Sequence, residues 1–462
     1  KDAWQVQQIA GQVAQLPAER LAALLDVDAP EGGWIFGLGH EDELRGDVPP
    51  PLRNDCFALP AGIDWTPVDD ALEMLRARLN PVVQSTTKSV VGAVGRILSS
   101  DVSALRSNPP LPNTAVDGFG FAGASVLGDG PFELPLLDGR AAAGLRFEGR
   151  VPSDSAIRIL TGAALPDGVD TVVLQEDVRS DGTRIAFNGP IKTGSNTRRA
   201  GEDVRVGETI LRAGRKVTPA DAALLSAVGV AEVHTYTPLC VGVLSTGDEL
   251  VETGQTARDG QIYDANRPML LAQLREWGFE AIDLGRAPDK RATLKGMLDA
   301  GAAKCDAILT SGGASAGDED HMSALLAETG SLELWRIALK PGRPLALGVW
   351  DGVPIFGLPG NPVAALVCTL IFARPALKLL SGAGWSTPNG FMVPAAFEKN
   401  KKAGRREFLR ARLRDGQVEV FKSEGSGRVS GLSWAEGLVE LPDGAMDIAH
   451  GTPVRFIPYD LF

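Results

Sequence analysis

The sequence predicts a multidomain protein in which an α/β unit is joined to smaller, mostly β domains. With 462 residues, the chain is long enough for about three or four domains of ordinary size. Between residues 239 and 386, apolar runs alternate with helical stretches, which is the pattern of a mainly parallel sheet covered by helices. Short alternating segments separated by glycine and proline fill residues 100–199 and 387–462, and they indicate small β domains, the second of them a barrel.

The individual elements follow from apolar spacing and from breaker residues. Apolar residues at helical spacing predict a helix within residues 1–26, and the Gly/Pro-rich stretch 29–59 reads as an arm or linker. Further helices are expected from Pro67 to about Leu79 and from Pro219 to Val228. In the α/β region, strands are expected at 240–244 and 307–310 and helices at 269–277, 292–300 and 322–329.

Composition excludes several classes of protein. An apolar fraction of 44% and a formal net charge of −12 are those of a folded acidic protein, so disorder of the whole chain is excluded and a nucleic-acid-binding surface is not favoured. No stretch approaches the ~20 continuous apolar residues of a membrane span. The four cysteines and four histidines are scattered along the chain, which gives no support to a disulfide framework or a zinc site. We therefore expect a cytoplasmic protein that binds neither nucleic acid nor membrane.

The turn after the first α/β strand is a candidate ligand site. It consists of small residues followed by two carboxylates: Ser245, Thr246, Gly247, Asp248 and Glu249. Ligands of open α/β sheets bind at the carboxyl ends of the strands, which is where this turn would lie. The alternative is a tight turn whose carboxylates cap the next helix.

A second strand end carries a stronger signal. Seven consecutive small residues, 311–317, separate a strand from the helix that follows, and three acidic residues, 318–320, come next. Small side chains let a ligand approach the backbone, N–H groups at a helix start attract phosphate, and carboxylate oxygens suit a hard cation. The candidate residues of this segment are Ser311, Gly312, Gly313, Ser315 and Asp320. The alternative is a helix start with acidic residues favoured by the helix dipole.

Two further turns of this region contain polar or charged residues between prolines. In KPGRP, Lys340 and Arg343 place two cations three residues apart in a stiff turn, so little entropy is lost when they meet an anion. The alternative is a solvated basic loop. In LPGNP, the small-residue turn consists of Pro359, Gly360 and Asn361, and the alternative there is that the prolines only end the strand.

Two glycine turns lie outside the α/β region. Asp117 precedes a glycine in NTAVDGFG and Thr161 precedes a glycine in RILTGA, and each alone is typical of a plain β-turn. No GxGxxG follows a strand, and neither GxxxxGK[ST] nor GxSxG occurs, which disfavours a Walker loop and a nucleophile elbow. The residues alone therefore predict an α/β enzyme domain with an acidic phosphate site, suited to a cation, beside a basic anion clamp.

Read together, nine motifs in this order resemble the molybdopterin molybdotransferase family, whose eukaryotic relatives include the E domain of gephyrin. The motifs are GRILSSDV, NTAVDGFG, IRILTGAALPDGVDTVVLQED, RRAGED, VLSTGDELV, GQIYDANR, LTSGGASAGDED, ALKPGRPLALG and LPGNPVAA. The resemblance runs from about Trp65 to Phe462. Residues 1–64 match nothing in the family pattern.

The resemblance implies an elongated protomer of four domains that forms a homodimer. It implies a discontinuous linking domain (65–99 and 200–238) that is interrupted by an inserted β domain (100–199). An α/β domain similar to molybdopterin adenylyltransferase (239–386) and a C-terminal β-barrel (387–462) would follow. Residues 1–64 would form an N-terminal extension of helix plus arm. A contact with molybdopterin adenylyltransferase is a further expectation.

The resemblance also implies a reaction and the residues that carry it. Adenylylated molybdopterin and molybdate would give the molybdenum cofactor and AMP, with Mg²⁺ assisting. Asp320 looks like the magnesium ligand, with Glu249 and Asp289 as neighbouring acidic residues. Lys340 and Arg343 would hold molybdate or a phosphate.

Other implied residues bind substrate or come from a second subunit. Asp117 and Thr161 look like residues that the β domain of the partner subunit brings over the cleft. The residues expected to line the pterin and nucleotide phosphates are Ser245, Thr246, Gly247, Asp248, Ser311, Gly312, Gly313, Ser315, Pro359, Gly360 and Asn361. Weaker candidates for anion contacts in the tail are Arg405, Arg410 and Ser426.

The sequence departs from the family pattern at two positions and leaves other functions open. Arg343 replaces the usual second lysine of the clamp, which keeps the charge but turns a point-like ammonium into a planar fork. Phe119 stands where tyrosine is common and lacks its hydroxyl. The alternatives are a cofactor-binding scaffold or carrier without turnover, a tungstate-inserting paralogue, and an adenylyltransferase acting one step earlier.

Overall fold

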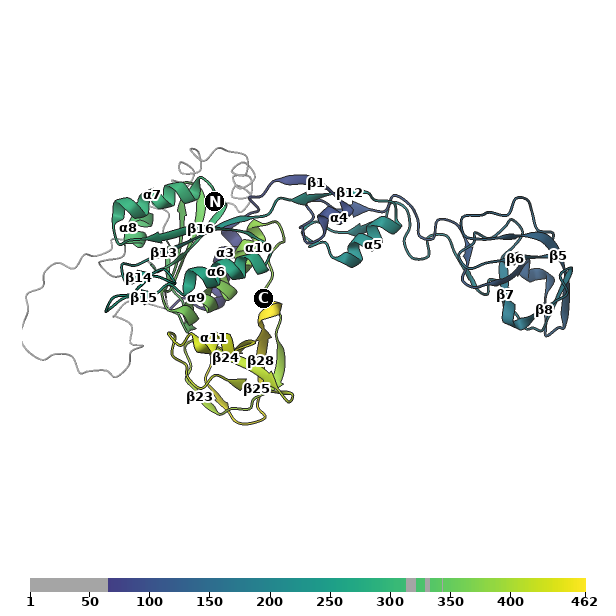
Figure 1. Cartoon of the computed structure of the whole chain (residues 1–462). Helices are drawn as coiled ribbons and strands as arrows, with labels where there is room; N and C mark the ends of the chain where they lie inside the picture. The colour runs from purple at the N-terminus through teal and green to yellow at the C-terminus, as the bar shows by residue number, and fades with distance from the viewer. Residues whose placement is uncertain (1–64, 313–320, 329–332, 343) are drawn as a thin grey trace, which may run out of the picture. The chain divides into compact units, whose positions relative to one another are not determined.

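The computed structural model describes residues 65–312, 321–328, 333–342 and 344–462 (Figure 1). The helix and arm expected within residues 1–64 lie outside this part of the chain. The chain divides into two units, residues 84–237 and the remainder.

The first unit begins and ends with two strands that run side by side. β1 (Ser85–Ser89) pairs antiparallel with β12 (Glu232–Tyr236) (Figure 1). The core beside this ribbon is made of valines and leucines such as Leu98 and Leu225, which are completely buried. The other elements here are α4 (Val90–Ala93), β2 (Val102–Ser103), β11 (Thr209–Leu211) and α5 (Pro219–Ala227). The predicted helix 219–228 is therefore present, and Thr218 and Asp221 cap it reciprocally.

The segment of the chain between β2 and β11 forms a six-stranded sheet. Its order is β7-β4-β6-β5-β9-β8, and Phe121 stacks on Phe187 in its core with ring centroids 5.2 Å apart. The strands are β4 (Gly118–Phe121), β5 (Phe132–Ala141), β6 (Ala156–Ile159), β7 (Thr171–Leu174), β8 (Val178–Ser180) and β9 (Arg184–Phe187). The short strands β3 (Asn113–Thr114) and β10 (Thr197–Arg198) pair with each other, and the 3-10 turns are η2 (Gly123–Ser125) and η3 (Gln175–Asp177).

The second unit contains a six-stranded sheet in the order β16-β13-β17-β21-β20-β18. The strands are β13 (Cys240–Thr246), β16 (Glu280–Ala287), β17 (Ala307–Ser311), β18 (Glu333–Arg336), β20 (Pro344–Trp350) and β21 (Val353–Leu358). The first four in spatial order are parallel, β20 pairs antiparallel with both of its neighbours, and β18 therefore runs in the same direction as the first four. The sheet is thus mixed, with one strand that runs against the other five. The cause is a hairpin at Asp351 and Gly352, which both adopt positive φ, as a tight two-residue turn requires.

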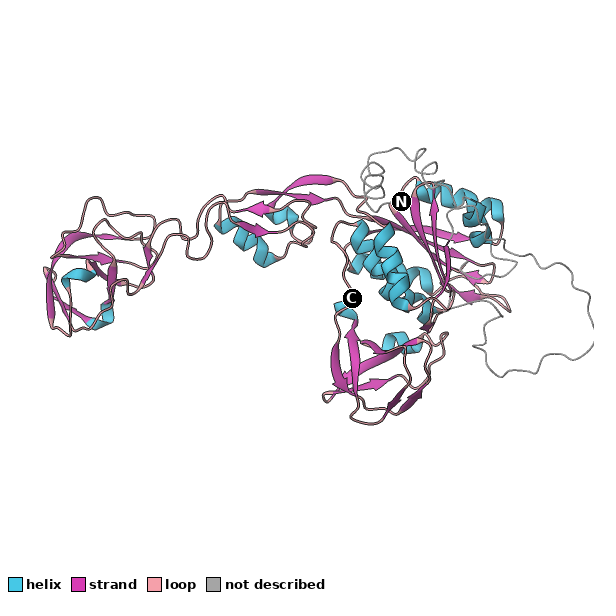
Figure 2. Cartoon of the chain, turned by 180° about the vertical axis from the view of Figure 1, so that it is seen from behind, coloured by secondary structure: helices cyan, strands magenta, loops and turns pink. Residues whose placement is uncertain are grey.

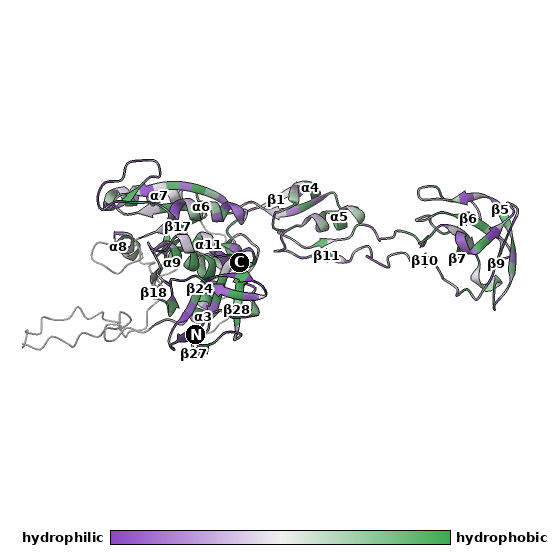
Figure 3. Ribbon diagram, turned by 60° about the horizontal axis from the view of Figure 1, so that its bottom comes forward, coloured by the Kyte–Doolittle hydropathy of each residue, from purple (hydrophilic) through white to green (hydrophobic). Residues whose placement is uncertain are grey.

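Helices lie against this sheet (Figure 2). They are α6 (Asn266–Glu276), α7 (Arg291–Ala302), α8 (His321–Glu328), α9 (Pro362–Cys368), the π-turn η4 (Thr369–Ala373) and α10 (Arg374–Leu380). Within the described chain, one continuous helix, 362–380, is long and apolar enough to cross a membrane, and 83% of its most apolar window is buried inside the protein. In Figure 3, α9 carries green, hydrophobic segments. The apolar composition of this helix is therefore explained by its place in the core.

Helix α3 (Val68–Arg78) corrects one predicted boundary. The sequence grouped residues 65–99 into one linking segment. In the structure, Val68, Ala71 and Leu75 are buried in the same core as the strands of the α/β sheet. The chain divides between residues 83 and 84, because the apolar stripe of α3 is covered by α/β side chains.

The C-terminal strands curl into a closed arrangement. The order is β25-β24-β26-β28-β22, and an isolated bridge between Ala395 and Val418 brings the chain after β22 back to β25. The strands are β22 (Phe391–Pro394), β23 (Lys399–Lys401), β24 (Arg406–Arg414), β25 (Gln417–Val420), β26 (Gly437–Leu441), β27 (Met446–Ile448) and β28 (Pro453–Pro458), with α11 (Ser430–Trp434) and η5 (Tyr459–Leu461). Strand β19 (Leu339–Lys340) adds to β24 in parallel, so Lys340 lies directly beside this domain.

Candidate functional site

Three strands that are followed by small residues in the sequence end at one edge of the α/β sheet. β13, β17 and β21 are neighbours and parallel, with Ser245 opposite Ser311 and Ser311 opposite Leu358. The chain therefore leaves the three strands at the same level. The carboxyl ends of parallel strands are where α/β domains bind ligands.

The turn after β13 gathers acidic side chains. The Asp248 N–H donates to Asp289 Oδ2 (3.1 Å), and the Asp289 N–H donates to Asp248 Oδ1 (3.2 Å). Gly247 has φ +138°, a backbone conformation that favours glycine. A Cβ there would lie 2.4 Å from Glu249 Oε2, so any other residue would also force the Glu249 side chain to move. Asp248, Glu249 and Asp289 are all exposed. The adjacent carboxylates Asp248 and Glu249 thus lie on one turn, and Asp289 lies on the loop bonded to it.

Asn266, at the start of α6, connects two of the strand ends. Its Nδ2 donates to Ser311 Oγ and to the Gly360 carbonyl, both at 2.7 Å. Asn266 Oδ1 and Ser245 Oγ are buried polar atoms without a hydrogen-bond partner among the described residues. Gly312, with φ +89°, follows Ser311, and its N–H donates to the Leu358 carbonyl at 3.1 Å. Asn266 belongs to the motif GQIYDANR, but the sequence alone assigned it no role. The feature that could have identified it is an amide side chain at the start of a helix that faces the sheet edge.

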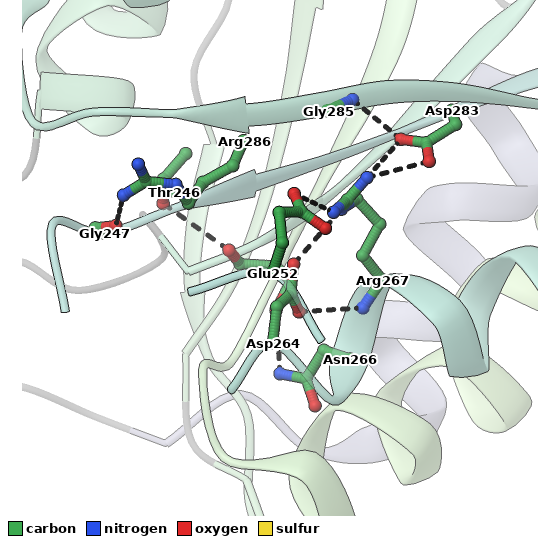
Figure 4. Close-up of polar contacts among 10 residues, drawn as sticks. Thr246, Gly247, Glu252, Asp264, Asn266, Arg267, Asp283, Gly285 and Arg286 are labelled. Atoms are coloured by element: carbon green, nitrogen blue, oxygen red, sulfur yellow. Dashed lines mark hydrogen bonds and ion pairs between the residues drawn. The ribbon is translucent and has the colours of Figure 1, made fainter. Parts of the chain in front are cut away.

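Arg267, the next residue, holds this segment in place (Figure 4). Its guanidinium donates to Asp283 (2.6 and 2.7 Å), to Asp264 (3.2 Å) and to Glu252. The side chain is only 9% exposed. Burial alone would lower the pKa of Arg267, but the hydrogen bonds that it donates to these carboxylates raise it. Arg267 therefore fixes the start of α6 and with it the position of Asn266.

Lys340 belongs to a second cluster of charges, at the contact of β19 with β24. Lys340 Nζ lies 2.6 Å from Glu424 and 3.5 Å from Glu407, and Lys399 Nζ lies 3.2 Å from Glu407 and also pairs with Glu424. A cavity of about 220 Å³ adjoins this cluster. The structure therefore supplies a second cation, Lys399, which the sequence did not indicate.

The predicted tail residues lie close to this cavity or beside Trp65. The guanidinium of Arg410 is buried and donates to the carbonyls of Ser423, Gly425 (3.1 Å) and Arg428 (2.7 Å). Burial lowers its pKa. The Ser426 carbonyl accepts from the Val363 N–H at the first turn of α9. Arg410 therefore supports the loop 423–428.

Arg405 is placed differently from the other tail candidates. Its guanidinium carbon lies 5.9 Å from the centroid of the Trp65 ring. This contact joins the start of the described chain to the C-terminal domain, and a cation over an aromatic face is a favourable arrangement.

Asp117 and Thr161 form one contact within the first unit. Asp117 Oδ1 accepts from the Thr161 N–H and from Thr161 Oγ1, both at 2.6 Å. These bonds, first that of the hydroxyl, lower the pKa of Asp117. The two residues looked like unrelated β-turns in the sequence, but Asp117 directly precedes β4 and Thr161 follows the end of β6, and these two strands are neighbours. Phe119 on β4 lies under the Arg158 guanidinium, 5.0 Å from its ring centroid.

Four predicted site residues, Gly313, Ser315, Asp320 and Arg343, lie outside the described residues. Within the described part of the chain, no three histidine, cysteine or acidic side chains are grouped so that they could hold a metal ion. The described acidic residues of the strand edge are those of the turn after β13 and its bonded loop.

Three family models match most of the described region. The MoeA N-terminal region (domain I and II) matches residues 66–229, a probable molybdopterin binding domain matches residues 242–379, and the MoeA C-terminal region (domain IV) matches residues 392–459. The first match includes Asp117, the second includes the sheet edge and Lys340, and the third includes Lys399.

Individual relatives agree with this assignment. The chain is 37% identical over 402 residues to molybdopterin molybdenumtransferase from Haemophilus influenzae, covering 85% of this chain and 98% of the relative. Gephyrin from Dictyostelium discoideum is 29% identical, over 85% of this chain and 62% of that protein. The crystal structure of the molybdopterin biosynthesis MoeA protein from Pyrococcus horikoshii OT3 superimposes with a TM-score of 0.75 at 28% identity, covering 86% of this chain and 100% of that one. These matches confirm the resemblance that the nine motifs indicated.

Proposed function

Because this chain belongs to the MoeA family of molybdopterin molybdenumtransferases, we propose that it inserts molybdenum into molybdopterin during molybdenum cofactor biosynthesis. In the proposed reaction, adenylylated molybdopterin and molybdate are the substrates, and AMP is released with the finished cofactor. The observation that carries the proposal is that β13, β17 and β21, each followed in the sequence by small residues, end side by side at one edge of the sheet.

The sheet edge is the proposed site for the pterin and its phosphates. Gly312 and Gly360 carry no side chain that would block an approach to the backbone, and Ser245 and Asn266 have buried polar atoms without partners in the described structure. Ligand oxygens or N–H groups can satisfy such atoms. Asn266 holds two of the three turns at a fixed separation.

Magnesium fits the chemistry of the acidic residues at this edge. Exposed carboxylates such as Glu249 offer the hard oxygen ligands that Mg²⁺ prefers, and the ion typically binds through one or two carboxylates plus substrate phosphates. We propose Asp320 and Glu249 as the ligands, with Asp248 and Asp289 beside them. When bound, the ion would neutralise charge on the phosphate oxygens at the bond that releases AMP.

Lys340, together with Arg343, is the proposed clamp for molybdate. Molybdate is a tetrahedral dianion, and fixed cations stabilise such charge most in a partly enclosed site. Lys340 is 26% exposed and adjoins the cavity next to β24. A substrate that reaches from the sheet edge to this cavity would bring the pterin and the oxyanion together.

A homodimer in the cytoplasm is part of the proposal. Asp117 and Thr161, on the first unit, are proposed to complete the site of a partner subunit. The Asp117 carboxylate is kept ionised by the two bonds from Thr161, which suits a polar role. A transient complex with molybdopterin adenylyltransferase would supply the adenylylated substrate.

The central experiment measures AMP release from adenylylated molybdopterin by the purified protein. We expect release only when molybdate and Mg²⁺ are both present, and its loss in Asp320→Ala. Tungstate in place of molybdate tests the metal preference in the same assay. Saturable pterin binding without AMP release would instead identify a carrier, and AMP release that does not depend on either oxyanion would contradict the proposal.

The shared site of a homodimer is tested by mixing two inactive variants. Asp117→Ala and Asp320→Ala place their defects in different proposed halves of the site. If each site combines residues of both subunits, refolded mixtures would regain about a quarter of the wild-type activity through heterodimers that retain one intact site. Mixtures that stay inactive, although size-exclusion chromatography shows exchange of subunits, would contradict a shared site.

A further inference from the structure

The Lys340 cluster contains two cations and two carboxylates that contact one another. Glu424 lies 2.6 Å from Lys340 and also pairs with Lys399, while Glu407 lies 3.5 Å from Lys340 and 3.2 Å from Lys399. Within the described chain, the two lysines are therefore bridged twice by carboxylates. A lysine pair held in this way is preorganised to bind an anion between its members.

The two carboxylates differ in how firmly they are held. Glu407 is on β24, directly opposite Lys340 in the ladder with β19, and its side chain is 10% exposed. Glu424 is on the loop after β25, and its side chain is 44% exposed. Glu407 is thus part of the sheet, whereas the Glu424 side chain can rotate into solvent without disturbing a strand.

The loop that carries Glu424 is itself anchored on both sides of this residue. Arg410 donates to the carbonyls of Ser423 and Gly425, and the Val363 N–H donates to the Ser426 carbonyl. The backbone of Glu424 therefore stays in place when the side chain turns away. An incoming anion can therefore replace the Glu424 carboxylate when the Glu424 side chain alone changes its rotamer.

The cavity beside the cluster has the right charge and size for a small anion. Its walls contain the carboxylates Glu398 and Glu424 and four cations, which are Lys340, Lys399, Arg410 and Lys422. The carboxylate of Glu407 pairs with both Lys340 and Lys399, so the cations outnumber the carboxylates by one when Glu407 is included. Its volume of about 220 Å³ far exceeds what a single water needs. Glu424 lies at the wall where Lys340 and Lys399 meet.

A dianion cannot join this cluster while both carboxylates remain, because like charges within a few ångströms repel strongly where water is partly excluded. We infer that Lys340 and Lys399 form an oxyanion-exchange site in which the Glu424 carboxylate occupies the position of the incoming tetrahedral dianion. The inference rests on the proposed function for the nature of the ligand. It adds Lys399 as a binding residue and Glu424 as an internal competitor.

The exchange explains how the site would select its ligand. A monovalent anion such as chloride carries no more charge than the Glu424 carboxylate and must compete with a tethered group, whose effective concentration is high. A dianion gains the additional attraction of both lysines. Because an anion must displace the Glu424 carboxylate to bind, the site favours divalent tetrahedral oxyanions. Molybdate and phosphate both belong to this class.

The test is a calorimetric titration of the full-length protein with sodium molybdate alone, without pterin or Mg²⁺. In Glu424→Gln we expect molybdate to bind about tenfold more tightly, because the competing carboxylate is gone while the side-chain shape is kept. Lys399→Met should weaken binding about tenfold, and the double variant should lose the gain. Glu419→Gln is the matched control: it removes the same charge from β25, where Glu419 pairs with Arg412, and it should leave the affinity unchanged.

Parallel titrations with inorganic phosphate distinguish the two sources of the oxyanion. A larger gain for molybdate than for phosphate in Glu424→Gln assigns the site to the metal oxyanion, and the reverse assigns it to a substrate phosphate. Unchanged or weaker binding of both anions in Glu424→Gln overturns the inference, whatever the AMP assay shows. Tighter molybdate binding in a protein that releases no AMP would keep the inference and contradict the proposed function.

Discussion

Two charge clusters of the second unit, those of Arg267 and Lys340, use the same kinds of residue for different ends. Arg267 faces three carboxylates and is 9% exposed. Lys340 shares two carboxylates with Lys399, is 26% exposed and adjoins a cavity. In the first cluster the guanidinium and Asp264 are buried, while Asp283 and Glu252 are about half exposed. In the second cluster the cation itself borders a cavity.

The difference indicates that the number of carboxylate partners and the burial of the cation, rather than charge alone, distinguish a structural cluster from a binding site. The planar guanidinium of Arg267 directs donors at Asp264, Asp283 and Glu252 simultaneously, which suits a fixed multi-partner contact. An ammonium is a point charge with rotatable donors, so Lys340 can pass from one anion to another. Substitutions in the two clusters should therefore affect different measured quantities.

The largest effect is expected for Arg267→Ala. The change leaves Asp264, whose side chain is 4% exposed, as an unpaired buried carboxylate, and removing one partner of a buried ion pair typically destabilises a protein by about 3–5 kcal/mol. Urea unfolding should show this loss. Arg414→Ala, which breaks the exposed pair with Glu436, is the control and should lower stability by less than about 1 kcal/mol. Equal effects of the two changes would refute the distinction between the clusters.

Asn266→Ala tests whether the scaffold acts on the sheet edge. It removes the two hydrogen bonds that connect Ser311 to the turn at Gly360. If about 1–3 kcal/mol of transition-state stabilisation is lost with them, the rate of AMP release should fall roughly 5–150-fold. Gln273→Ala, on the same helix and bonded only to Glu276 in the described contacts, should retain activity. A fall in melting temperature with a normal turnover rate would show that Asn266 serves only folding.

A smaller difference between the two clusters is expected in their response to salt concentration. Raising sodium chloride from about 0.05 to about 0.5 M should weaken molybdate binding at the Lys340 site several-fold, because partly exposed charges are screened. The stability difference between wild type and Arg267→Ala should change by less than about 0.5 kcal/mol, because buried pairs are screened much less. The measurements are the same calorimetric titration and urea unfolding at the two salt concentrations.

The smallest effect is the pH dependence of the Arg267 cluster. Burial raises the pKa of Asp283, but the hydrogen bonds from Arg267 and from the Gly285 N–H lower it below its usual value. A depressed folded-state pKa means that Asp283 stabilises the fold above the unfolded-state value near 3.8, and that this contribution is lost as the pH falls through the folded-state pKa. In urea unfolding between pH 7 and pH 3, Asp283→Asn should therefore lose less stability than wild type. A parallel loss in both proteins would contradict the assignment.

Much of the site could be predicted because its signals are local. Glycine, proline and small polar residues after apolar runs marked the turns at Ser245, Ser311 and Pro359, and parallel pairing placed them at one edge. The hairpin at Asp351 and Gly352 also carried a local signal, yet the strands it joins were not predicted. The mixed character of the sheet was missed for that reason.

Contacts between distant residues could not be predicted. Glu424 reaches Lys340 across 84 residues, and Asn266 reaches Gly360 across 94. No spacing rule relates such positions, because a polar side chain on a turn has many possible partners until the strands are ordered. The pairing of Asp117 with Thr161 could not be predicted for the same reason.

The sequence by itself determined the family, the alternation of strands and helices and the turns that end at the sheet edge, because backbone preferences and apolar periodicity act over a few residues. Only the tertiary structure decided which charged side chains are held in fixed ion pairs and which can exchange their partner for a ligand. That choice depends on burial and on partners brought together by strand order, as Arg267 and Lys340 show.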